Sequence, residues 1–288
     1  MNRQNGKYLR KPEWLRSRLT RAQDLRHVRD VLGVGSLHTI CESGSCPNKG
    51  ECWAAGTATF MILGDTCTRN CRFCNVRTGK PFPPDPQEPE RVAEAVASLG
   101  VTHCVLTSVD RDDLPDGGAA HWAQTVRAVK RAAPETTLEA LIPDFGGHEE
   151  SLMLLIQAGP EVISHNLETV RRLTPGVRSG ADYDRSLGVI RFLTEHSAAR
   201  TKSGLMLGLG EREDELLEAM DDLLEAGCQV LTIGQYLQPS RRHLPVERYV
   251  HPDDFKRYGE WALQKGFRFV ESAPLVRSSY HAEKHVGS

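Results

Sequence analysis

The chain has 288 residues, with 36 Lys and Arg against 38 Asp and Glu and a formal net charge of -2 at pH 7. This balance provides no bulk attraction to nucleic acid or to an anionic membrane surface. Hydrophobic residues make up 39% and charged residues 26%, which excludes a disordered acidic chain. No apolar run approaches the roughly 18 residues that a membrane-spanning helix needs, and the length fits one α/β barrel or two small domains.

The amino-terminal region is rich in arginine, but no apolar segment of the signal-peptide type follows it. An organellar transit peptide is also Arg-rich; here the acidic Glu13 and Asp24 and a helical spacing of apolar residues favour a folded amphipathic helix instead. The apolar positions are Leu15, Leu19, Leu25, Val28 and Leu32. We therefore expect a cytoplasmic protein with an amino-terminal helical extension.

Six of the eight cysteines form two triplets near the amino end. The triplets are Cys41-x4-Cys46-x5-Cys52 and Cys67-x3-Cys71-x2-Cys74. Because a chain of this length builds its own core and carries no secretion signal, clustered thiols indicate metal binding more than disulfides. A structural zinc site uses four ligands, whereas each triplet supplies three, and thiolates are the usual ligands of iron–sulfur clusters.

The cysteine patterns leave some alternatives open. A zinc knuckle is the alternative for the second triplet, and the first triplet fits zinc, an iron–sulfur centre or buried cysteines when it is taken alone. Cys104 and Cys228 lie inside a predicted strand and just after a predicted helix, so we expect them to be small core residues.

Helices and strands alternate after a proline-rich connector at 80–86. Periodicity predicts strands at 59–63, 101–107, 137–142, 161–164, 204–207 and 229–233. It predicts helices at 90–99, 118–132, 149–158, 182–196, 212–226 and 252–265. Six βα units predict an α/β fold with a parallel sheet, a partial (β/α)6 barrel similar to a TIM barrel. The active site of such a barrel lies at the carboxyl ends of the strands.

Three segments are expected from this pattern. Residues 1–57 form an amino-terminal extension with the first cysteine triplet, 58–271 form the partial barrel, and 272–288 form a tail that closes the site. A last apolar segment at 267–270 precedes the tail.

The second triplet has Phe73 directly before its last cysteine, and this C-x3-C-x-aromatic-C run resembles the signature of the radical S-adenosylmethionine superfamily. The resemblance implies a [4Fe-4S] cluster on Cys67, Cys71 and Cys74 with one iron open to S-adenosylmethionine. Reductive cleavage of that molecule yields a 5′-deoxyadenosyl radical, the type of cofactor chemistry that attacks unactivated C–H bonds.

Both triplets and the terminal run Arg277-Ser278-Ser279-Tyr280 together resemble the lipoyl synthase family over nearly the whole chain. The resemblance implies a second, auxiliary [4Fe-4S] cluster on Cys41, Cys46 and Cys52, with Ser279 as fourth ligand and Ser278 as the neighbouring alternative. Serine is a harder and weaker ligand for iron than thiolate, which suits a labile corner. Arg277 is expected near that corner, with a surface ion pair as its alternative.

The implied reaction inserts two sulfur atoms at C6 and C8 of an octanoyl chain attached to a lysine of a lipoyl carrier protein. The auxiliary cluster is consumed as the sulfur source. The implied partners are therefore the octanoylated carrier, an electron donor such as ferredoxin or flavodoxin, and an iron–sulfur cluster carrier that reloads the enzyme. No nucleic acid or membrane partner is expected.

Residues at the strand ends are candidates for binding S-adenosylmethionine. We expect contacts from Phe73, Ser108, Asn166 and Glu168, although Ser, Asn and Glu also cap turns and helices. The run 208–211, Gly-Leu-Gly-Glu, lacks the spacing of a phosphate-binding loop and is expected to give the cofactor backbone room.

Two other functions compete with the one that the resemblance implies. One is a sulfur-inserting radical enzyme that acts on a free small molecule, and the other is a non-catalytic iron–sulfur carrier or zinc scaffold.

Overall fold

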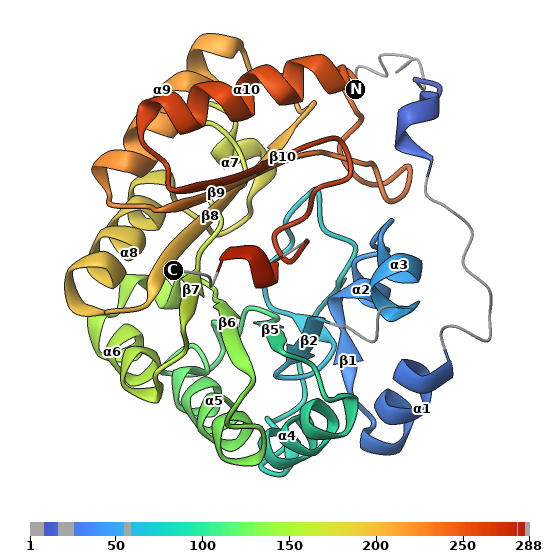
Figure 1. Ribbon diagram of the computed structural model, residues 1–288, viewed down its shortest axis with the longest axis vertical. Helices are drawn as coiled ribbons and strands as arrows, with labels where there is room; N and C mark the ends of the chain where they lie inside the picture. Colours follow the sequence, from blue (N-terminus) through green and yellow to red (C-terminus); the bar gives the residue numbers. More distant parts are fainter. Residues whose placement is uncertain (1–8, 17–25, 55–58, 281, 286–288) are drawn as a thin grey trace.

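The computed structural model describes residues 9–16, 26–54, 59–280 and 282–285, and its centre is an eight-stranded sheet (Figure 1). In spatial order the strands are β1 (His38–Thr39), β2 (Thr59–Ile62), β5 (His103–Ser108), β6 (Thr137–Leu141), β7 (Val162–Ser164), β8 (Arg200–Leu207), β9 (Val230–Gln235) and β10 (Phe269–Ser272). β1 is antiparallel to β2, and the other pairs are parallel. The sheet curves into a ring that stays open, because β1 and β10 are its two edges.

Six helices follow the strands β2, β5, β6, β7, β8 and β9 in turn and cover the outside of the ring (Figure 1). They are α4 (Glu88–Leu99), α5 (Ala119–Ala132), α6 (Glu149–Ala158), α8 (Tyr183–His196), α9 (Glu213–Glu225) and α10 (Pro252–Lys265). The predicted partial (β/α)6 barrel is confirmed. The boundaries follow local chemistry, since the Asp182 side chain caps α8 by accepting from the Arg185 N–H, and Gly100 ends α4 in a left-handed conformation.

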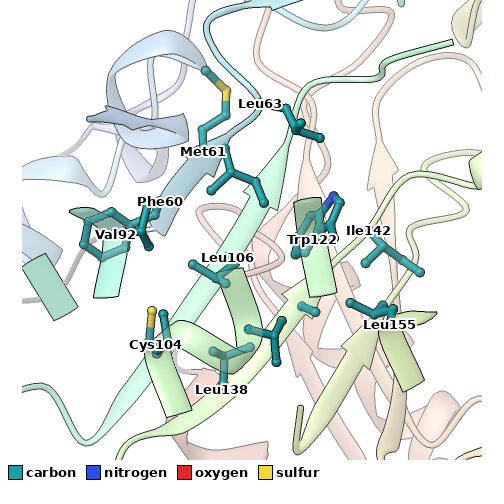
Figure 2. Packing of buried hydrophobic residues seen from close by; sticks show 14 of the residues in the cluster. Phe60, Met61, Leu63, Val92, Cys104, Leu106, Trp122, Leu138, Ile142 and Leu155 are labelled. Atoms are coloured by element: carbon teal, nitrogen blue, oxygen red, sulfur yellow. The ribbon is translucent and has the colours of Figure 1, made fainter. Parts of the chain in front are cut away.

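The core lies between the sheet and these helices. Figure 2 shows side chains of the strands, including Phe60, Leu106 and Leu138, in one cluster with Val92 of α4 and Trp122 of α5. Cys104 belongs to this cluster and Cys228 to the neighbouring one under α9 and α10. Both cysteines are buried in apolar surroundings, which confirms that they are core residues.

Two strands differ from the sequence prediction. The apolar segment at 267–270 contributes to β10, a seventh parallel strand whose Phe269 lies in register with Val230 of β9. β8 begins at Arg200, four residues before the predicted start, and includes the fully buried Lys202. Lys202 Nζ lies 2.8 Å from Glu139 Oε2 of β6, so the strand interior accepts a charge that the apolar pattern does not reveal.

Short elements connect the barrel to both ends of the chain. The amino-terminal segment contains a 3₁₀ turn, η1 (Glu13–Leu15), and α1 (Arg26–Gly35), followed by α2 (Ile40–Ser43) and α3 (Lys49–Ala54), which hold the first cysteine triplet. The predicted helix is thus confirmed only over its second half, where Val28 and Leu32 are buried; Leu19 and Leu25 lie outside the described residues. Small elements after β2 are β3 (Thr66–Cys67) and β4 (Arg77–Thr78); η3 (Phe145–Gly147) follows β6, and α7 (Thr174–Val177) follows β7. The last described element of the tail is η4 (Ala282–His285), which contacts β5 within the ring of strands (Figure 1).

We expect Lys202→Met to lower the free energy of unfolding by about 3–5 kcal/mol, because the change leaves the buried Glu139 carboxylate without its cation. Lys256→Met is the matched control, since Lys256 and Glu260 form a solvent-exposed pair on α10. Denaturant unfolding of the anaerobic holoenzyme measures both changes. Equal losses for the two variants would contradict the prediction, and Glu139→Leu combined with Lys202→Met should recover much of the stability.

Candidate active site at the carboxyl ends of the strands

A cavity of about 580 Å³ lies at the carboxyl ends of the parallel strands. All the predicted site residues except Cys52 line it: Cys41, Cys46, Cys67, Cys71, Phe73, Cys74, Ser108, Asn166, Glu168, Arg277, Ser278 and Ser279. The chain therefore brings its amino-terminal triplet, the loop after β2, the ends of β5 and β7 and the tail to one place. Lys11, Asp144 and Arg178 also line the cavity and were missing from the predicted set.

The loop with the second triplet leaves β2 through a sharp turn. Leu63 and Gly64 have φ values of 67° and 89°, and the Leu63 conformation is costly for a residue with a side chain. The Leu63 N–H donates to Glu88 Oε2 at 2.7 Å, and the same oxygen lies 2.7 Å from His121 Nε2. These buried contacts from α4 and α5 hold the turn and direct the chain into β3, where Cys67 lies.

The three thiols of this loop are half-buried and lie close to one another. Burial raises the pKa of Cys67 and of Cys71 to about 12, and the nearby Asp110 carboxylate and Cys74 add to the rise. Burial also raises the pKa of Cys74. Three thiolates at this position would repel one another and lack solvation, so they require a cationic partner. The donor set therefore fits a bound iron–sulfur cluster.

The first triplet has the same character. Burial raises the pKa of Cys52 to about 12, and the charges of Cys41 and Cys46 raise it further. Cys52 is therefore close enough to interact with the two cysteines of its triplet that line the cavity. All eight cysteines lie among the described residues, and none forms a disulfide. Within the described part of the chain, no group of three or more His, Cys, Asp or Glu side chains is arranged around a single metal ion.

Arg69 anchors the loop of the second triplet to the barrel. Its Nε and Nη2 atoms donate to the two Asp112 carboxylate oxygens at 2.8 and 2.7 Å, and Nη2 also lies 2.7 Å from Asp144 Oδ1. Burial alone would raise the pKa of Asp144, but the hydrogen bond and charge of Arg69 outweigh it and hold that pKa well below its usual range. The loop is thus tied to the ends of β5 and β6. Asp144 follows a predicted strand, so the rule that placed the other site residues at strand ends could also have identified it.

Asn166 and Glu168 follow β7 and point into the cavity. Glu168 has a φ of 67°, and its backbone is held by hydrogen bonds from its N–H to Gly204 O and from the Met206 N–H to its own carbonyl, both 2.8 Å long. Asn166 Nδ2 donates to Glu168 Oε1 at 3.0 Å and to Ser278 Oγ at 2.6 Å, while Asn166 Oδ1 is buried without a hydrogen-bond partner among the described residues. A buried oxygen without a partner, and a glutamate with a strained backbone at a strand end, are typical of a binding site.

Ser108 and Phe73 lie in the same cavity but also have packing roles. Ser108 Oγ accepts a hydrogen bond from Trp122 Nε1 at 3.1 Å, which fixes the hydroxyl at the end of β5. Phe73 packs against an apolar group that includes Tyr236 and Val246, and so it holds the loop against the segment after β9.

The tail places Arg277 between the two halves of the cavity. Burial has the largest effect on the pKa of Arg277 and lowers it. The negative charges of Cys46 and Glu168 act in the other direction and raise that pKa. Arg277 Nη1 donates to Val276 O at 2.6 Å. The guanidinium thus lies inside the site, and the expected position near the first triplet fits better than the surface ion pair.

Comparisons with known proteins decide the family. The model of the Radical SAM superfamily matches residues 61–223. The chain is 58% identical over 282 residues to the lipoyl synthase of Bacteroides fragilis strain YCH46, covering 98% of both chains, and 55% identical to that of Porphyromonas gingivalis, covering 98% of this chain and 100% of the relative. The chain belongs to the lipoyl synthase family.

Membership in the lipoyl synthase family makes this chain a radical S-adenosylmethionine enzyme of lipoyl formation. It therefore works with a [4Fe-4S] cluster and S-adenosylmethionine. The competing function of a non-catalytic carrier or zinc scaffold is wrong.

Solved structures show the same fold as this lipoyl synthase family member. Methylornithine synthase PylB aligns with a TM-score of 0.54 at 13% identity, covering 92% of this chain and 82% of that one. Streptococcus suis SuiB bound to S-adenosylmethionine aligns with a TM-score of 0.56 at 14% identity, covering 79% and 55% of the two chains. These likenesses support the open barrel. No described helix of this family member is both long and apolar enough to cross a bilayer.

One expectation about the loops is wrong for this family member. Gly208 gives no room to the cofactor, because a Cβ there would lie 2.1 Å from Gln235 Nε2 and 2.5 Å from Arg248 O. The Glu211 carboxylate accepts from the N–H groups of Gly208 and Leu209 at 2.8 and 2.9 Å. The turn after β8 is thus held by its own hydrogen bonds, and the lack of a side chain at Gly208 allows Gln235 and Arg248 to pack against it.

Proposed function

We propose that the enzyme inserts sulfur at C6 and C8 of an octanoyl chain held in amide linkage on a lysine of a lipoyl carrier protein. The observation that carries this proposal is the shared cavity, which is lined by the second cysteine triplet, by Cys41 and Cys46 of the first, and by the Arg277 to Ser279 tail. A radical generated on one side of this space reaches a substrate carbon and a sulfur source without leaving the protein. Family membership supports the same reaction.

We assign the radical side of the cavity to Cys67, Cys71 and Cys74 as ligands of the cluster. When bound, that cluster supplies the electron that cleaves S-adenosylmethionine into methionine and a 5′-deoxyadenosyl radical. Asn166 and Glu168 are placed to hold polar groups of S-adenosylmethionine, since Asn166 Oδ1 is buried and lacks a partner among the described residues. Ser108 and Phe73 complete this wall of the cavity.

We assign the other side to the sulfur donor, an auxiliary [4Fe-4S] cluster that the reaction consumes as a substrate. Its ligands are Cys41, Cys46 and Cys52, with Ser279 as the fourth. Ser279 is favoured over Ser278 because Ser278 Oγ already accepts the 2.6 Å hydrogen bond from Asn166 Nδ2. Departure of a serine oxygen, a weaker ligand for iron than thiolate, opens the corner nearest the tail.

The residues between the two sides orient the reaction. Arg277 lines the same cavity as Glu168 and Cys46, and we assign to it the positive charge that balances sulfide charge there. The octanoyl chain occupies the space between the triplets, where the strand ends exclude bulk water from the radical. Two C–H bonds are broken in turn, at C6 and then at C8, and each consumes one S-adenosylmethionine.

The partners follow from this chemistry. The enzyme needs an octanoylated carrier domain, a low-potential electron donor such as ferredoxin or flavodoxin, and an iron–sulfur cluster carrier that rebuilds the auxiliary cluster after each turnover. We place the enzyme in the cytoplasm, because thiols that stay out of disulfides suit a reducing compartment.

Mass spectrometry of the carrier tests the proposal. The anaerobically reconstituted enzyme is incubated with S-adenosylmethionine, dithionite and either an octanoyl-lysyl carrier domain or free octanoic acid. We expect the carrier domain to gain two sulfur atoms and the free acid to stay unchanged. Sulfur insertion into the free acid alone would overturn the choice of a protein-bound substrate and favour an enzyme of free small molecules.

A further inference from the structure

Asn48 joins the first cysteine triplet to the tail. Its side chain is 4% exposed, and Nδ2 donates to Leu275 O at 2.7 Å across 227 positions of the sequence. The backbone of Asn48 is fixed as well, because its carbonyl accepts from the Cys52 N–H at 3.0 Å. A movement of the tail relative to Cys46 and Cys52 therefore requires this buried hydrogen bond to break and leaves a buried polar group without its partner.

Gly234 of β9 lies against the same stretch of tail. A Cβ on this residue would lie 2.2 Å from Val276 O and 3.1 Å from the Val276 carbonyl carbon, and backbone cannot yield as a flexible side chain does. The Gln235 N–H donates to Pro274 O at 3.2 Å and the Ala273 N–H to Ile233 O at 3.2 Å. The tail thus lies on β9 only because position 234 has no side chain.

The tail leaves this position in a turn that presents its serines. The Tyr280 N–H donates to Arg277 O at 2.9 Å, so Ser278 and Ser279 occupy the two central positions of the turn. Asn166 holds Ser278 on the side of Glu168. With Leu275 held by Asn48 and Ser278 held by Asn166, the chain between them has little freedom, and Ser279 is presented from a fixed base.

We propose that Asn48 and Gly234 are positioning residues that form a seat for the tail and thereby set Ser279 against the first cysteine triplet. The inference rests on the proposed role of Ser279 as a ligand of the auxiliary cluster. The Asn48 amide donates a hydrogen bond to the tail backbone, and the absence of a side chain at Gly234 leaves the space in which that backbone lies. Neither residue touches the reacting atoms.

Asn48→Asp is the sharpest variant, because it keeps the size of the side chain but removes the donor and sets a carboxylate oxygen against Leu275 O. We expect lipoyl formation to fall on the order of a hundredfold, the cost of misplacing a reacting group. Cleavage of S-adenosylmethionine should stay within about twofold of wild type, since Cys67, Cys71, Cys74 and their surroundings are unchanged. Mössbauer spectra should show the cysteine-bound auxiliary cluster with its serine-bound iron altered.

Gly234→Ala tests the seat from the other side and should show the same split between the two activities. Thr194→Ala is the matched control for stability: it removes side-chain hydrogen bonds to the carbonyls of Ile190 and Gly227 outside the cavity, and both activities should remain.

Ser279→Ala, assayed in parallel, separates the inference from the proposed function. If Ser279→Ala loses lipoyl formation while Asn48→Asp and Gly234→Ala keep the wild-type rate and Mössbauer spectrum, the seat is wrong and the ligand assignment stands. If Ser279→Ala forms lipoyl groups at the wild-type rate, the assignment of Ser279 as a ligand is wrong, and so is the proposal that Asn48 and Gly234 act by positioning Ser279. Parallel loss in all three variants, with S-adenosylmethionine cleavage retained, is the result that the inference predicts.

Discussion

Cys71→Ala is expected to abolish cleavage of S-adenosylmethionine and every later step. The change removes one of the three thiols of the loop after β2, and the remaining two cannot leave the single open iron that the cofactor needs. Product analysis of 5′-deoxyadenosine under reducing conditions measures the effect, and iron analysis should show one cluster in place of two.

Cys228→Ala is the control for this variant. Cys228 is buried in the cluster under α9 and α10 and does not line the cavity, so its loss costs the packing of a small side chain and its contact with Val230 O. We expect this variant to cleave S-adenosylmethionine as the wild type does. Wild-type cleavage by Cys71→Ala would contradict the assignment of the radical cluster to the second triplet.

Ser279→Ala is expected to lose lipoyl formation almost completely while it continues to cleave S-adenosylmethionine. The radical side of the cavity keeps all its ligands, but the auxiliary cluster loses the oxygen that makes one corner labile. The assay compares 5′-deoxyadenosine with the sulfur content of the carrier, so that cleavage without sulfur insertion appears as a large excess of 5′-deoxyadenosine.

Ser278→Ala distinguishes the two adjacent hydroxyls. This variant removes the acceptor of the 2.6 Å bond from Asn166 and should weaken lipoyl formation without abolishing it, because the ligand itself remains. If the two variants exchange their effects, with Ser278→Ala inactive and Ser279→Ala active, then Ser278 is the ligand of the auxiliary cluster.

The link between Asn166 and Ser278 connects the two halves of the active site. Asn166 lines the cavity in which we propose that S-adenosylmethionine binds, and it holds the tail through Nδ2. A ligand that engages Asn166 is therefore in contact, through one side chain, with the turn that presents Ser279.

The barrel and the motif of the loop after β2 were predictable from the sequence because their signals are local. The spacing of Cys67, Cys71 and Cys74 lies within one loop, and each helix shows its own apolar period. The first half of β8 is not predictable in this way, because its signal is not local. Lys202 is compatible with a buried strand only because it pairs with Glu139 of β6. Charge pairing between distant strands leaves no periodic signal.

Several features of the site depend on contacts between segments far apart in the chain. The role of Asn48 is not predictable from the sequence, because its partner is a backbone carbonyl in the tail and no sequence pattern marks such a contact. Gly208 was interpreted as space for the cofactor, whereas the structure fills that space with Gln235. A glycine indicates that something approaches closely but does not identify what approaches.

The central claim is that the auxiliary cluster on the first triplet supplies the inserted sulfur. The most direct test is one turnover of enzyme whose clusters were reconstituted with heavy-isotope sulfide and transferred to buffer with ordinary sulfide. We expect both sulfur atoms on the carrier to carry the heavy isotope, and we expect Mössbauer spectra to lose the auxiliary cluster while the radical cluster persists. Ordinary sulfur in the product, with both clusters intact, would contradict it.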